Sequence, residues 1–208
     1  MKKILIFSCL IFTFFSCEDL TELNVDPKNP LVVESGPLFA NSIVELFDLM
    51  ASTNVNDNNF RLWSQYWAQT TYSDESNYEL NERNVSGRTW DKLYATVVKD
   101  LRDAKKFVAT TTDEDVPPAE KATQTAMADI LEIFTYHILV DIFGDIPYTD
   151  AIGNDITPIY DNDEDIYNTL ITKLDVAINN LTGTSTWDAY DLIYGGNVDS
   201  WKKLANSL

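Results

Sequence analysis

The sequence contains only two cysteines, Cys9 and Cys17, and both lie near its N-terminus. The rest of the chain can therefore form neither a disulfide nor a zinc site built on cysteine. Glycine and proline are also scarce, with 7 of each among 208 residues, so the fold is not dominated by loops. Hydrophobic residues make up 45%, which is enough to bury a core. The folded part must depend on that core for its stability.

Basic residues are few as well. Lys and Arg together number 15 against 33 Asp and Glu, and the formal net charge is −18. Clustered Lys and Arg are needed to bind a phosphate backbone, so this charge argues against nucleic acid as a partner. It argues equally against electrostatic docking on an anionic lipid surface. The single histidine, His137, has no catalytic partner motif beside it, and we expect it to be a core histidine.

The N-terminus has the pattern of a lipoprotein signal peptide over residues 1–16. Two lysines precede an apolar run, residues 4–15, that is shorter than the ~20 apolar residues of a membrane span. The small residue before Cys17 resembles a bacterial lipobox, so we expect Cys17 to become the lipidated N-terminus that anchors the protein. The alternative is an ordinary signal peptide in which this cysteine is incidental. Residues 17–35, with several prolines and turn formers, are expected to form an extended tether.

Hydrophobic residues recur at intervals of three and four through most of residues 36–208, which predicts an all-α domain. Its neighbouring helices should pack as stacked hairpins with long irregular loops. The expected helices span 36–50 with Ser35 as cap, 60–67, 86–108 with Ser86 as cap, 117–143 with Gly144 as stop, 161–181 with Asp161 and Glu164 as a capping box, and 199–208 with Asp199 as cap.

Two of these helices carry further expectations. The second half of the 117–143 helix is apolar nearly all round but is interrupted by Asp129, Glu132 and Asp141. We therefore expect a buried core helix and not a membrane span. The last helix ends without a cap for its final carbonyls, so we expect the sequence to be the front part of a longer protein.

Several segments together resemble a known family. Residues 143–151 read F-G-D-I-P-Y-T-D-A, which resembles the F-G-D-x-P-Y-x-x-A signature of the SusD/RagB family. Three other segments agree with the family and occur in the same order: N-V-D-P-K-N-P at 24–30, P-I-Y-D at 158–161 before E-D-I-Y at 164–167, and Y-G-G-N at 194–197 before W-K-K-L-A-N-S-L at 201–208.

The resemblance implies a fold of tetratricopeptide-like hairpins, although the tetratricopeptide consensus itself is not visible. It further implies a surface-exposed lipoprotein of the outer membrane that acts as a lid on a TonB-dependent transporter of the SusC type. Such a protein captures glycans or peptides, delivers them to the transporter and needs no cofactor. Four signature residues are expected to be structural, because they stop a helix, bond local backbone and shape a turn: Gly144, Asp145, Pro147 and Tyr148.

Aromatic residues in polar surroundings are the candidates for ligand binding. Trp63, Trp67, Tyr72 and Tyr78, together with Tyr66, lie close together in the sequence. Sugar rings present apolar C–H faces that stack on such side chains, while nearby amides and carboxylates bind the hydroxyl groups. For the two tryptophans the alternative is the core of a helix, whereas we expect the tyrosines at 72 and 78 to be exposed. The polar neighbours are Gln65, Gln69, Asp74 and Asn77.

The sequence gives only weak support for a metal site or for other aromatic binding residues. Asp161, Asp163 and Asp165 have the spacing of a calcium loop, but Ile166 stands where that loop needs glycine and Thr172 where it needs glutamate. Acidic residues at a helix N-terminus explain this pattern better, and we expect no metal site. Trp90 and Trp201 begin helical stripes and are expected in the core.

We expect a binding protein and not an enzyme, and two alternatives remain open. A helical-repeat scaffold that binds only proteins would have no affinity for small ligands. A lipid-anchored glycan hydrolase would need a pair of carboxylates in a cleft, and the many acids of this chain do not identify one.

Overall fold

The computed structural model describes residues 34–208 except 56, 81, 154, 155 and 186, and this part of the chain is an all-α domain. The expected signal peptide, Cys17 and nearly all of the expected tether lie outside the described residues. The helices, including the 3-10 helix η2 and the π-helix η3, are α2 (Ser35–Ala51), α3 (Phe60–Trp63), η2 (Glu75–Asn77), α4 (Val85–Asp91), η3 (Lys92–Val98), α5 (Lys99–Thr110), α6 (Pro118–Phe143), α7 (Asp163–Asn180) and α8 (Val198–Ala205). Within the described residues, β pairing is limited to one antiparallel bridge between Ile146 and Asp161.

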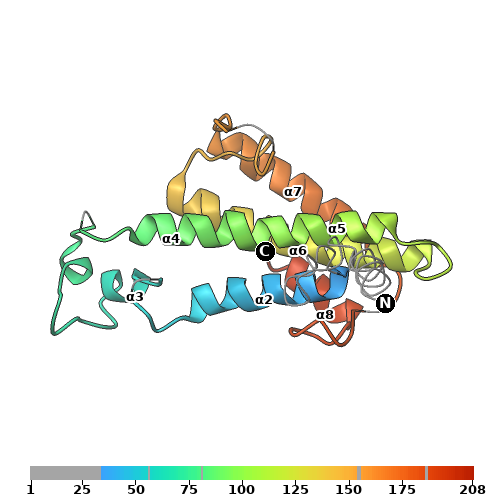
Figure 1. Ribbon diagram of the computed structural model, residues 1–208, viewed down its shortest axis with the longest axis horizontal. Helices are drawn as coiled ribbons and strands as arrows, with labels where there is room; N and C mark the ends of the chain where they lie inside the picture. Colours follow the sequence, from blue (N-terminus) through green and yellow to red (C-terminus); the bar gives the residue numbers. More distant parts are fainter. Residues whose placement is uncertain (1–33, 56, 81, 154–155, 186) are drawn as a thin grey trace, which may run out of the picture. The chain divides into compact units, whose positions relative to one another are not determined.

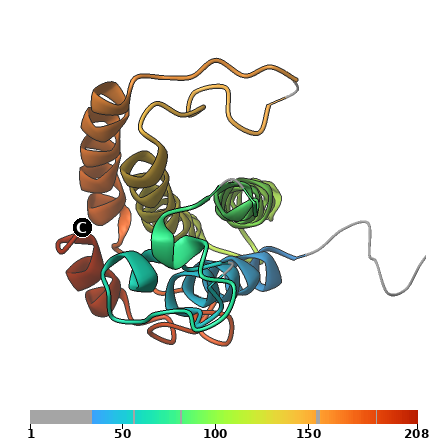
Figure 2. The ribbon, with the colours of Figure 1, turned by 90° about the vertical axis from the view of Figure 1, so that its left-hand side faces the viewer.

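Consecutive helices pack against one another as hairpins. Helices α4, η3 and α5 form one continuous rod, and α2 packs along it in the opposite direction (Figure 1). Helix α6 packs between α5 and α7, as the view along the helices shows (Figure 2). The short α8 contacts α6 and α7. The expected class, an all-α fold of stacked helical hairpins with long irregular connections, is confirmed.

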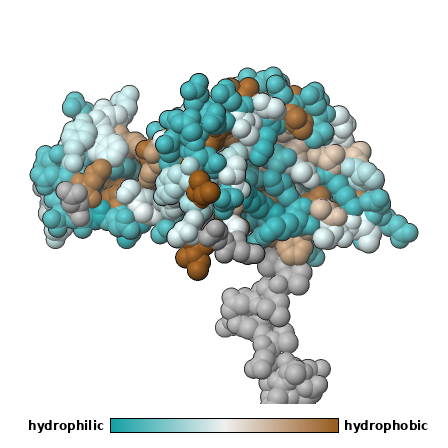
Figure 3. Space-filling model, turned by 90° about the horizontal axis from the view of Figure 1, so that it is seen from above, coloured by the Kyte–Doolittle hydropathy of each residue, from teal (hydrophilic) through white to brown (hydrophobic). Residues whose placement is uncertain are grey.

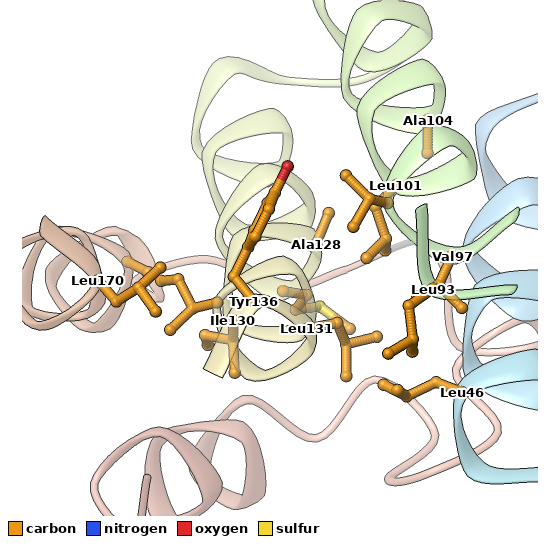
Figure 4. Close-up of a cluster of buried hydrophobic side chains, with 14 of the residues drawn as sticks. Leu46, Leu93, Val97, Leu101, Ala104, Ala128, Ile130, Leu131, Tyr136 and Leu170 are labelled. Carbon is orange, nitrogen blue, oxygen red and sulfur yellow. The ribbon is translucent and has the colours of Figure 1, made fainter. Parts of the chain in front are cut away.

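The core lies around α6. Leu170 of α7 approaches α6 from one side, while Leu93 and Leu101 of the rod approach it from the other (Figure 4). Helix α6 is covered on both sides, which explains why the second half of its sequence is apolar nearly all round. The expectation of a buried core helix is therefore confirmed, and none of the helices in the described residues has the length and apolarity to cross a membrane. The fully buried side chains of α6 include Met127, Ile130, Leu131, Tyr136 and Leu139.

Three of the expected caps are wrong. Ser35 is the first residue of α2, and its hydroxyl accepts a hydrogen bond of 3.2 Å from the indole nitrogen of Trp187. Asn84 caps α4 in place of Ser86, and Asn197 caps α8 in place of Asp199. The asparagine side chains accept from backbone N–H groups three residues later, at 3.0 and 2.9 Å. At α4 and α8 more than one side chain able to cap stands within two positions of the helix start, so the sequence alone does not decide between them.

The expected capping box of α7 is also wrong. The helix begins at Asp163, and Asn162 is its cap. Asp161 instead accepts hydrogen bonds from the backbone nitrogens of Tyr148 at 2.9 Å and Thr149 at 2.8 Å. This carboxylate therefore holds the preceding loop and is not available to the helix.

The helix expected over 60–67 is much shorter. It ends at Trp63, because Gln65 adopts a positive φ of 62° and turns the chain. The backbone nitrogens of Tyr66 and Trp67 then both bond to the carbonyl of Arg61. Tyr66 and Trp67 thus lie in a loop, where they are exposed and do not pack against the bundle.

Candidate ligand-binding site

The aromatic candidates lie on a single long connection between α2 and α4, residues 52–84, which we call the aromatic loop. It carries the short helices α3 and η2 and extends beyond the packed ends of α2 and α4 (Figure 1). Figure 3 shows that the surface seen from above is largely hydrophilic, with scattered hydrophobic residues. Because few residues of the loop pack on the bundle, the loop needs an internal scaffold of its own.

That scaffold is polar and partly buried. The side-chain oxygen of Gln69 accepts from the backbone nitrogen and hydroxyl of Ser76, both at 3.1 Å, and its amide nitrogen donates to Glu75 at 2.8 Å. Glu75 is only 1% exposed and pairs with Arg83, whose Nε lies 3.2 Å from its carboxylate. A buried carboxylate is stable only with such partners. These contacts tie three parts of the loop together.

Trp63 is the centre of a small aromatic cluster. Its indole nitrogen donates to the carbonyl of Glu75 at 3.1 Å, and the hydroxyl of Tyr78 donates to the carbonyl of Trp63 at 3.2 Å. The rings of Trp63 and Tyr78 stack with centroids 6.2 Å apart, and Phe60 meets Trp63 edge-on at 5.4 Å. Trp63 is half-buried, so the core interpretation describes it in part: it belongs to the core of the loop and not of the bundle.

The other aromatic side chains of the loop face solvent. Tyr66 is 83% exposed, Tyr72 76%, Tyr78 62% and Trp67 41%. The expected exposure of Tyr72 and Tyr78 is confirmed, and the core alternative for Trp67 is wrong. The guanidinium of Arg61 lies 4.9 Å from the ring centroid of Trp67 and steadies that ring.

Two of these tyrosines have an unusual backbone. Tyr72 and Tyr78 have φ values of 56° and 63°, a left-handed conformation that bulky residues seldom adopt. The polar scaffold holds them there, and the guanidinium of Arg83 lies 5.9 Å from the centroid of Tyr72. Exposed rings in fixed positions beside amide and carboxylate groups can stack on the C–H face of a sugar and bind its hydroxyls.

The signature segment, residues 143–151, makes its contacts within the fold. Gly144 ends α6 with a φ of 73°, and its nitrogen donates to Val140 at 2.8 Å. Asp145 accepts from the backbone nitrogen of Asp163 at 3.0 Å, and the carbonyl of Pro147 accepts from the hydroxyl of Tyr94 at 2.6 Å. Tyr148 is buried against Tyr136, with ring centroids 4.7 Å apart. These contacts support the structural interpretation of the signature.

Comparison with known families agrees with this geometry. A family model for SusD-like proteins, described as "Starch-binding associating with outer membrane", matches residues 27–208. The chain belongs to this SusD-like family. Among curated proteins, none matches the chain.

Solved structures share the SusD-like fold. A SusD/RagB family protein from Bacteroides thetaiotaomicron is 23% identical, with a TM-score of 0.66 over 84% of this chain. A SusD homolog from Parabacteroides distasonis is 22% identical, with a TM-score of 0.64 over 83%. A chitin-binding SusD homolog from Flavobacterium johnsoniae is 25% identical, with a TM-score of 0.62 over 81%. The matches cover 36%, 33% and 37% of those structures, so the chain spans about a third of their length.

The histidine of this SusD-like chain is not the core residue that we expected. His137 is half-buried, at the surface between α6 and α7. Its Nε2 lies 3.3 Å from the carboxylate of Asp141, one helical turn later, and its ring meets Tyr167 edge-on at 5.6 Å. The hydroxyl of Tyr167 donates to the same carboxylate. The i,i+4 spacing of His137 and Asp141 was the signal that sequence reasoning missed.

The two tryptophans expected in the core and the aspartates with calcium-loop spacing make their contacts within the fold. Trp201 is fully buried, as expected, whereas Trp90 is half-buried and packs on the edge of the core against Phe143. The carboxylate of Asp161 faces the signature segment, and Asp163 accepts from the backbone nitrogen of Glu164. Across residues 34–208, leaving aside the few positions that are not described, no group of three or more His, Cys, Asp or Glu side chains could hold a metal ion.

Proposed function

We propose that this SusD-like chain forms part of a nutrient-capture protein that binds glycans through the aromatic loop, by binding alone and without bond chemistry. The observation that carries the proposal is the set of exposed rings, Tyr66, Trp67, Tyr72 and Tyr78, held on a partly buried polar scaffold. A group of exposed aromatic rings on one loop suggests a recognition surface. The starch-binding description of the family and the chitin-binding relative support glycan over peptide as the ligand.

The proposal includes the location and the partner. Lipidation of Cys17 would anchor the protein in the outer membrane with its ligand face at the cell surface, and a SusC-type TonB-dependent transporter would receive the cargo. The experiment is a pull-down of the tagged protein from outer membranes followed by mass spectrometry. Recovery of a TonB-dependent barrel in stoichiometric amount supports this part of the proposal. Its absence, with the protein folded and at the surface, overturns it.

Glycan binding is tested by titrating the protein with malto- and chito-oligosaccharides in a calorimeter. We expect Trp67→Ala and Tyr72→Ala each to weaken binding about tenfold, which corresponds to ~1.4 kcal/mol for one lost stacking contact. Tyr160→Ala is the matched control, because the exposed fraction of Tyr160, 60%, lies between those of Trp67 and Tyr72 and Tyr160 lies on another loop. Equal effects of all three substitutions, or no binding of either glycan by the wild type, contradict the assignment.

A further inference from the structure

A second candidate site lies away from the aromatic loop. A pocket of about 210 Å³ is formed by α5, α6, α7 and the signature segment. One part of its lining is apolar and comes from Ile133, Leu170 and Val176. The other part carries charged and hydroxyl groups, including Lys105, Asp129, Glu132, Tyr148 and Lys173. Sequence reasoning did not find this pocket, because its residues are scattered between Lys105 and Val176 and only the fold brings them together.

The charges on the inner side of the pocket neutralise one another. The ammonium of Lys105 lies 2.6 Å from both Asp129 and Glu132. Arg102 lies behind them, with its Nε 2.9 Å from the other oxygen of Glu132 and a second nitrogen 2.9 Å from the hydroxyl of Tyr136. Two cations thus face two carboxylates. This group contributes no net charge, but its carboxylate oxygens can still accept hydrogen bonds.

Lys173 is the other cation that lines the pocket, and it lies apart from this neutral group of charges. The ammonium of Lys173 lies 4.7 Å from the ring centroid of Tyr148, in a cation–π contact that positions it at the pocket. It forms no ion pair with any residue that the structure describes. The pocket therefore carries one uncompensated positive charge, in a chain whose net charge is −18. In such an acidic protein, a lysine that faces a pocket without a carboxylate partner favours an anionic ligand.

We propose that this pocket binds a small hydroxylated carboxylate of the size of a hexuronate. Lys173 pairs with the ligand carboxylate, Asp129 and Glu132 accept hydrogen bonds from its hydroxyl groups, and the apolar wall covers the C–H face of its ring. The volume of about 210 Å³ lies below the ~300–1,000 Å³ of sites for larger ligands, so a single sugar unit fits better than a chain. The inference goes beyond the proposed function, because this site shares no residue with the aromatic loop.

The test is a calorimetric titration of the full chain with glucuronate, and with glucose as the neutral probe of the same ring size. We expect glucuronate to bind with a Kd on the order of 1 mM and glucose to bind at least tenfold more weakly. Lys173→Gln should weaken glucuronate binding at least tenfold, and Lys173→Arg should retain it. Lys203→Gln on α8 makes the same change in net charge at an exposed position and should have no effect.

Three results of these titrations would contradict the proposed pocket site. No binding of glucuronate, equal binding of glucose, or equal losses for the variants at 173 and 203 overturns the proposal. Trp67→Ala separates the two sites: it should weaken oligosaccharide binding and leave glucuronate binding unchanged. Loss of both by Trp67→Ala would show that glucuronate binds at the aromatic loop, which overturns the pocket and keeps the proposed function.

Discussion

The indole nitrogen of Trp201 donates a hydrogen bond of 2.7 Å to the carboxylate of Asp191, and both side chains are buried. The same carboxylate accepts from the backbone nitrogens of Ile193 at 3.0 Å, Tyr194 at 3.1 Å and Gly196 at 2.7 Å. One side chain therefore accepts from the indole and from three backbone N–H groups of the turn that leads into α8. Buried donors without partners are costly, so Asp191 specifies how α8 joins the bundle.

The first prediction concerns this carboxylate. Asp191→Ala leaves the indole and three backbone N–H groups without their acceptor, and we expect a loss of about 3 kcal/mol in the free energy of unfolding. The measurement is urea denaturation followed by tryptophan fluorescence. Asp175→Ala, at an exposed position of α7, serves as the control and should change stability by less than ~0.5 kcal/mol. A loss no greater than that of the control would show that Asp191 does not hold the turn.

The second prediction concerns the buried charges beside α6. Burial raises the pKa of Glu132, but Lys105 and Arg102 outweigh it and hold the pKa below its usual range, so the group is ionised. Glu132→Ala leaves both cations without this partner and should cost about 3–5 kcal/mol, as for other broken buried pairs. Asp129→Ala is the control, since Asp129 is more exposed and Lys105 keeps Glu132; its cost should be ~1 kcal/mol or less. Guanidinium denaturation of both variants compares the two values, and similar losses would contradict the assignment.

The third prediction is a pH dependence of the signature segment. Partial burial raises the pKa of Asp161, but hydrogen bonds from the backbone of Thr149 and Tyr148 and from the Thr149 hydroxyl outweigh it and lower the pKa from its ordinary 3.8. A carboxyl whose pKa is lower in the folded state stabilises the fold above its unfolded pKa and loses this contribution as pH falls through the folded value. The contribution of Asp161 is therefore present above about pH 4 and disappears below it.

Comparison of the wild type with Asp161→Asn between pH 6 and pH 2 measures this effect. The difference in unfolding free energy should be greatest at the upper end of the range and should shrink below about pH 4. Asp150→Asn, an exposed change in the same loop, should show no such convergence. A constant difference between the wild type and Asp161→Asn across the range would mean that the carboxylate is not preferentially ionised in the fold.

The helices could be predicted from the sequence because the spacing of apolar residues is itself the cause of their packing. The stripe that includes Leu93, Val97 and Leu101 is buried as its period requires. The caps could not be predicted, since neighbouring side chains have similar capping ability. Asp161 or Asn162 can each cap α7, and the choice depends on the backbone of Tyr148, which is close to Asp161 only in the folded chain.

For the candidate sites, too, exposure that follows from local sequence could be predicted, and burial that depends on distant contacts could not. The polar neighbours of Tyr72 and Tyr78 were sufficient to predict that both side chains are exposed, although their left-handed backbone was not foreseen. The burial of Glu75 had no local signal, because a glutamate in a polar run is normally exposed. It is buried only because Gln69 and Arg83, six residues before and eight after it, fold back onto its carboxylate.

The fourth prediction follows from that burial. Glu75→Ala removes the acceptor of Gln69 and the partner of Arg83, so we expect the aromatic loop to open locally while the bundle remains intact. Trypsin should then cleave after Arg61 or Arg83 at least tenfold faster, since cleavage of a fast-opening segment follows the population of the open form. Oligosaccharide binding should weaken although Glu75, at 1% exposure, cannot touch a ligand.

The free energy of unfolding of the bundle should stay within ~0.5 kcal/mol, because α5, α6 and α7 pack without the loop. Glu79→Ala, at an exposed position of the same loop, is the matched control. Unchanged cleavage with weaker binding would show that the loss of binding does not come from opening of the loop, whereas a large global loss of stability would mean that the loop and the bundle unfold together.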